Sequence, residues 1–145
     1  MIGRFFLRKK HNILIIQPIA SFSGSLKSLE QYLRHMHNNF NFTFLTQNGP
    51  SAKTLKKYGK VYKSLGLTKF DNTLNSHYSG YRWILLIREF FYIPFSILSL
   101  LKIKYSNEKI NLIHLNEITG LPTAILAKLI FNTPLIVHVR SLNNL

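Results

Sequence analysis

Three short runs of almost uninterrupted apolar residues constrain the fold more than any other feature of the sequence. They are residues 12–17 (NILIIQ), 111–116 (NLIHLN) and 134–139 (PLIVHV). Runs of this length without polar–apolar alternation are typical of strands buried on both faces of a parallel sheet. Two further short strands are expected, at residues 42–46 (FTFLT) and around Val61–Tyr62.

Segments with helical character separate these strands. Apolar residues at three- and four-residue spacing predict a helix from Leu26 to Met36. Further helices are expected over residues 52–60, 81–103 and 123–131. Because strands and helices alternate, the sequence predicts an α/β fold, a Rossmann-like parallel sheet with helices on both faces. We expect residues 1–145 to form a single domain that is truncated at its C-terminus, because the chain ends directly after a strand.

The charge balance limits the possible chemistry and partners. Nineteen Lys and Arg residues against five Asp and Glu residues give a formal net charge of +14. Such a positive potential favours phosphates, nucleic acid or an anionic membrane surface. With few, scattered carboxylates and no cysteine, a divalent-cation cage, a two-carboxylate glycosidase site and thiol chemistry are all disfavoured. We therefore expect no metal and no cofactor.

The apolar stretch from Trp83 to Leu101 is long enough to raise the question of a membrane span. Arg88 and Glu89 lie in its first third and Pro94 near its middle, so spanning is disfavoured. A helix that is apolar on nearly all sides either packs within a core or lies at a bilayer surface. The N-terminal apolar run is too short for a signal peptide.

Candidate binding residues follow the strands, because ligands bind beyond the carboxyl ends of strands in parallel α/β sheets. The first loop carries Ser23, Gly24 and Ser25 directly before a helix, whose first amide groups suit an anion. The alternative is that Gly24 serves only a tight turn.

The second loop carries Asn116, Glu117 and Thr119. Strand alternation places His114 on the same side as Asn116. We interpret His114 as a residue of the sheet and expect Asn116 and Glu117 to reach ligand hydroxyl groups.

The third loop carries Arg140 and Ser141. An arginine at a strand end binds phosphate or carboxylate in a bidentate manner. An ion pair between Arg140 and Glu117 is the structural alternative. Since no Ser-His-Asp arrangement is present, we do not expect this chain to complete a reaction alone.

Two segments, taken in order, carry a resemblance to a known family. They are residues 13–33 (ILIIQPIASFSGSLKSLEQYL) and 111–142 (NLIHLNEITGLPTAILAKLIFNTPLIVHVRSL). Together they resemble the N-terminal, acceptor-side domain of a GT-B glycosyltransferase of family 4. The resemblance implies the N-terminal half of a GT-B architecture whose second, donor-binding domain is absent.

The resemblance also implies an activity and roles for individual residues. Members are retaining enzymes that transfer a sugar from a nucleotide-sugar to an acceptor across a cleft between two domains. Gly24 and Ser25, with Ser23, would lie near the donor phosphates. Asn116 occupies a position often held by histidine and Arg140-Ser141 one often held by His-Asp, so Asn116 and Arg140 are the catalytic candidates in place of a histidine. Other substrate-binding candidates are Glu117, Thr119 and Ser141.

The resemblance, together with the basic charge and the apolar helix, implies a hexosyltransferase half that acts on a lipid-linked or envelope polysaccharide acceptor at the cytoplasmic face of a membrane and is inactive without its donor domain. Its expected partners are a nucleotide-sugar, a glycan or lipid-linked acceptor and an anionic membrane surface. The alternative is a basic module that binds a membrane surface or nucleic acid without catalysis. Nucleic acid is the less favoured partner, because many aromatic residues fall in predicted strands and the apolar helix.

Overall fold

A single parallel sheet organises the chain. The computed structural model describes residues 10–70, 80–106 and 108–139. Within these residues the five strands lie in the order β3-β2-β1-β4-β5, and every neighbouring pair is parallel. The strands are β1 (His11–Gln17), β2 (Phe40–Gln47), β3 (Lys60–Ser64), β4 (Leu112–Leu115) and β5 (Leu135–Val137). The predicted parallel α/β fold is therefore confirmed.

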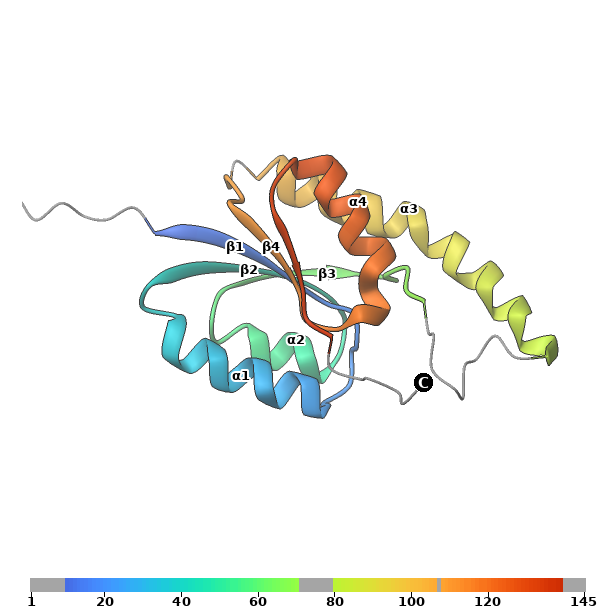
Figure 1. Ribbon diagram of the computed structural model, residues 1–145, viewed down its shortest axis with the longest axis horizontal. Helices are drawn as coiled ribbons and strands as arrows, with labels where there is room; N and C mark the ends of the chain where they lie inside the picture. The colour runs from blue at the N-terminus through green and yellow to red at the C-terminus, as the bar shows by residue number, and fades with distance from the viewer. Residues whose placement is uncertain (1–9, 71–79, 107, 140–145) are drawn as a thin grey trace, which may run out of the picture.

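Helices cover both faces of this sheet (Figure 1). Helices α1 (Gly24–Met36) and α2 (Pro50–Leu55) lie on one face, and α3 (Leu85–Lys104) and α4 (Leu121–Phe131) lie on the other. Short 3-10 turns precede the second pair, η1 (Gly80–Ile84) before α3 and η2 (Ile118–Gly120) before α4.

The apolar runs supply both halves of the core. Along β1, Ile13 and Ile15 pack toward α1 and α2, whereas Leu14 and Ile16 pack toward α3 and α4. Successive side chains of a strand point to opposite faces, so a strand covered on both faces needs apolar residues at every position. This requirement explains why the run from residue 13 to residue 16 is uninterrupted.

Two predicted elements near α2 have different bounds in the structure. The expected helix over residues 52–60 is wrong in its second half, because α2 begins at Pro50 and ends at Leu55. Beyond it, Gly59 lies against the backbone of Phe42 so closely that no side chain fits there. Strand β3 is longer than expected, because it also includes the exposed Lys60 and Lys63 and the buried Ser64 at the edge of the sheet.

The long apolar helix lies against the sheet. Leu100 and Ile103 near its C-terminal end are fully buried beside Leu14 and Ile16. No helix among the described residues is both long and apolar enough to cross a membrane.

Candidate functional site

The point where the chain reverses its direction across the sheet lies between β1 and β4. From β1 the chain passes to β2 and β3 on one side, and β4 and β5 follow on the other side. The loops that leave β1 and β4 therefore diverge, and such a point is where α/β sheets bind ligands. Ile16 pairs with Leu115 across these two strands, so the following residues, Gln17 and Asn116, lie side by side at the carboxyl edge.

Asn116 connects the two loops at this edge. Its side-chain Nδ2 donates a hydrogen bond to Oε1 of Gln17 at 2.6 Å and a longer one to the backbone carbonyl of Ser25 at 3.3 Å. Asn116 and Gln17 are both fully buried. The amide of Asn116 thus fixes the start of α1 relative to the ends of β1 and β4.

The start of α1 is open to solvent at Gly24. Ser23 caps the helix, with its Oγ accepting from the backbone N–H of Leu26 at 3.3 Å, and the hydroxyls of Ser23 and Ser25 lie 2.9 Å apart. Gly24 is exposed, and no atom lies within 4 Å of where a Cβ would stand. The first turn carries no acidic residue, so the positive end of the helix dipole is not neutralised locally.

The second predicted loop packs tightly beneath the first. Glu117 is buried directly before η2. A Cβ on Gly120 would come within 3.0 Å of Cγ of Pro18 and 2.9 Å of Cδ1 of Leu115. The absence of a side chain at Gly120 therefore lets η2 approach the loop that leaves β1.

A segment that the sequence did not indicate, residues 66–70, also reaches this edge. The backbone N–H of Phe70 donates to the carbonyl of Thr119 at 2.7 Å, and the Thr123 hydroxyl donates to the carbonyl of Thr68 at 2.7 Å. From α3, the Ser96 hydroxyl accepts from the backbone N–H of Thr68 at 2.9 Å. These bonds join residues that are far apart along the chain, so no local pattern reveals them.

His114 lies within β4, as expected, on the α1 side of the sheet. Its ring contacts that of Tyr32 edge-on, with centroids 6.3 Å apart, and stacks on that of His138 at 6.1 Å. The three rings help to line an open cavity of about 290 Å³ beside α1, over β4 and β5.

Arg140 and Ser141 lie outside the described residues, so the structure does not position the third predicted loop. Of the other candidates, Ser25 and Asn116 are in direct contact. Thr119 belongs to η2, which lies at the same edge of the sheet. Within residues 10–70, 80–106 and 108–139, no group of three or more histidine or acidic side chains is placed to hold a metal ion.

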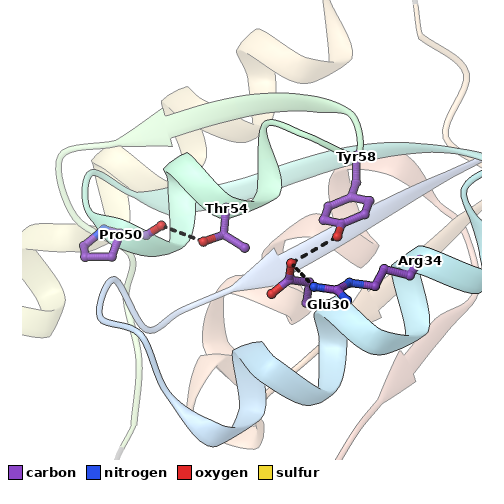
Figure 2. Close-up of polar contacts among 5 residues, drawn as sticks. All are labelled: Glu30, Arg34, Pro50, Thr54 and Tyr58. Carbon is purple, nitrogen blue, oxygen red and sulfur yellow. Dashed lines mark hydrogen bonds and ion pairs between the residues drawn. The ribbon is translucent and has the colours of Figure 1, made fainter.

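A polar cluster between α1 and the segment after α2 secures the helix from which this edge is built. Figure 2 shows Arg34 and Tyr58 converging on Glu30, and both donate to its Oε1 at 3.1 Å. The hydrogen bond from Arg34, with that from Tyr58, holds the pKa of Glu30 below its ordinary value. The cluster links α1 to the segment after α2 and has a structural role.

Gln17 is the residue at this edge that sequence reasoning missed. Its Nε2 also donates to the carbonyl of Ile19 at 3.3 Å, which shapes the loop toward α1. The sequence does contain a signal for the pairing of Gln17 with Asn116, because the runs NILIIQ and NLIHLN both end in a residue with a side-chain amide.

Comparison with known proteins supports the fold. No protein-family model and no curated protein sequence matches the chain. Among solved structures, that of Anabaena HepE in complex with UDP and glucose superposes with a TM-score of 0.53 over 88% of this chain and 29% of that chain, at 14% identity. The glycotransferase of kitacinnamycin superposes with a TM-score of 0.51 over 90% of this chain and 30% of that one, at 15% identity.

These likenesses concern architecture. At such low identity they show that the chain shares the Rossmann-like α/β fold of these two structures. The chain spans less than a third of the length of either structure.

Proposed function

We propose that this chain is the acceptor-binding, N-terminal half of a GT-B glycosyltransferase of family 4 type. The reaction would move a hexosyl group from a nucleotide-sugar to a lipid-linked or envelope polysaccharide acceptor, at the cytoplasmic face of a membrane. A donor-binding domain, continuous with this chain or supplied by another, would complete the cleft.

One observation carries the proposal. Asn116 contacts the start of α1 at the carboxyl edge between β1 and β4, where the chain reverses its direction across the sheet. The space around Gly24 is open to an anion, and the positive helix end favours phosphate. A fold shared with a protein solved with UDP and glucose supports the same ligand class.

In this proposal Ser23, Gly24 and Ser25 face the donor phosphates. Asn116 acts at the cleft wall by holding Ser25 in place, since its own Nδ2 bonds the Ser25 carbonyl. Arg140 would face the developing negative charge of the leaving nucleotide. Thr119 and Ser141 are the remaining candidates for contacts with sugar hydroxyls, whereas Glu117 is buried directly before η2.

Reconstitution with a donor-binding domain tests the proposal. The chain is co-expressed with or fused to such a domain, and release of nucleoside diphosphate from common nucleotide-sugars is measured with Gly24→Val alongside. Because space around Gly24 is open, the valine should fold normally yet obstruct the phosphates, lowering turnover about tenfold or more.

Gln31→Val is the matched control, because it places the same side chain at an exposed position of the same helix. It should leave turnover within about twofold of the original. Absence of transfer and of donor hydrolysis with every common donor, or equal activity of Gly24→Val and Gln31→Val, would refute the proposed function.

A further inference from the structure

Helix α3 is apolar on the side that faces away from the sheet. Its inner side carries Ser96, Leu100 and Ile103, which are buried. Large side chains at three-, four- and seven-residue spacing face solvent on the other side, each at least 45% exposed. We call this set the outer stripe: Ile87, Phe90, Phe91 and Leu98 of α3, with Trp83 in η1 before the helix and Tyr105 directly after it.

This arrangement inverts the usual pattern of a surface helix. The solvent side of an amphipathic helix is normally polar, and contiguous exposed apolar surface marks a site of interaction. Figure 1 shows the first half of α3 extending beyond the sheet. The neighbouring helix α4 packs on the same face and adds exposed Ile125 and Leu129.

The charges around the outer stripe select an anionic partner. Helix α4 has no acidic residue, and Glu89, the only one in α3, is buried and bonded to Arg88. Exposed Lys102 lies in the last turn of α3 and Lys128 in that of α4. The chain as a whole carries a net charge of +14.

The carboxylates elsewhere do not offset this charge. Glu30 is paired with Arg34 and Glu108 with Lys60, while Glu117 is buried. Among the described residues, then, each acidic side chain is either bound to a cation or withdrawn from the surface. A neutral apolar partner would leave the excess positive charge uncompensated.

We propose that the outer stripe binds the surface of an anionic lipid bilayer, with α3 lying along the membrane. The phenylalanines would enter the boundary between headgroups and acyl chains, and the lysines would contact the headgroups. Trp83 and Tyr105, at the two ends, have the amphipathic rings that favour this boundary. This assignment does not depend on sugar transfer.

The single tryptophan of the chain, Trp83, reports binding directly. Its emission is recorded as phosphatidylcholine vesicles are added, with and without phosphatidylglycerol, and vesicle flotation measures the bound fraction. We expect a blue shift and co-flotation only with the anionic vesicles. Brominated lipid should quench the emission of the bound protein.

Variants separate the outer stripe from general charge attraction. Phe90→Ser/Phe91→Ser should weaken vesicle binding about tenfold or more, and Lys102→Glu should weaken it less. Phe22→Ser is the matched control, because Phe22 is a similarly exposed aromatic residue before α1 on the other face, and its binding should be unchanged. Should the double variant not fold, Leu98→Ser tests the same stripe.

Three results would overturn the proposal. One is an unshifted Trp83 spectrum with anionic vesicles, and another is equal binding by Phe90→Ser/Phe91→Ser and Phe22→Ser. The third is that the original chain forms a dimer and does not bind vesicles, while the double variant is monomeric. The outer stripe would then join two copies of the protein.

Discussion

The side-chain Nδ2 of Asn116 lies 2.6 Å from Oε1 of Gln17, and this buried hydrogen bond joins the ends of β1 and β4. The same amide also reaches the carbonyl of Ser25. One side chain therefore sets the position of the first turn of α1 relative to two strands. Replacing the Asn116 side chain should therefore disturb the packing of the loops at the carboxyl edge, although most of the hydrophobic core lies elsewhere.

Asn116→Leu should destabilise the fold by about 1–3 kcal/mol, because the buried Oε1 of Gln17 loses its donor. Urea unfolding measures the change. Gln17→Leu/Asn116→Leu should cost less than the sum of the two single changes, because the double variant leaves neither amide facing an apolar partner. Strict additivity would show that the two amides are not energetically coupled.

Ser96→Ala should destabilise the fold by about 1–3 kcal/mol, since the buried backbone N–H of Thr68 would lose its acceptor. Ser99→Ala in the same helix is the matched control. Its hydroxyl is less buried and donates to the Phe95 carbonyl one turn away, so its loss should cost less than about 0.5 kcal/mol. Equal thermal stability of the two variants would contradict this reading of residues 66–70.

Gly120→Ala should lower stability by about 1–3 kcal/mol, because the new Cβ would crowd Leu115 and Pro18. Gly24→Ala, at an open position in a helix, should instead be neutral or stabilise by about 0.4–1 kcal/mol through the unfolded chain. Thermal unfolding compares the pair. A Gly120→Ala variant as stable as Gly24→Ala would mean that η2 does not sit tightly against the loop after β1.

Lowering the pH should reduce the stability of the fold, because it protonates Glu108. Burial disfavours the charged form of Glu108, but hydrogen bonds from Lys60 at 2.8 Å and Thr43 at 2.7 Å outweigh it and hold its pKa below the ordinary 4.5. The folded state thus binds its proton at lower pH than the unfolded chain. Stability from this site is complete above pH 4.5 and declines as pH falls through the folded pKa.

Glu108→Gln should flatten this part of the pH dependence, as unfolding free energies at a series of acidic pH values would reveal. Lys60→Met should also flatten it, because it removes the cation that lowers the pKa of Glu108. If both variants kept the original slope, another group would be responsible.

The sheet was predictable because its central strands are buried on both faces. That requirement produces almost uninterrupted apolar runs at residues 12–17 and 111–116. The edge strand β3 was less clear in the sequence, because the exposed Lys60 and Lys63 leave only Val61–Tyr62 as an apolar segment. Helix bounds shifted by a few residues where Ser23 and Pro50 begin helices earlier than the apolar spacing suggests.

The candidate site was predictable only in outline. Strand ends identified Ser25 and Asn116, which are in contact. The bond from Phe70 to Thr119 was not predictable, because it joins backbone groups 49 residues apart whose identities carry no signal. Nor could the sequence tell which side of α3 faces solvent, because both sides are apolar.

Amide chemical-shift mapping of the ¹⁵N-labelled chain with UDP-glucose tests the central claim most directly. The account predicts shifts at Ser23–Ser25 and at Asn116–Gly120, with inorganic phosphate at matched ionic strength producing weaker effects there. Shifts confined to the basic cavity at the opposite edge, around Lys10, His11 and Lys109, would contradict it. So would a spectrum in which UDP-glucose and phosphate act identically.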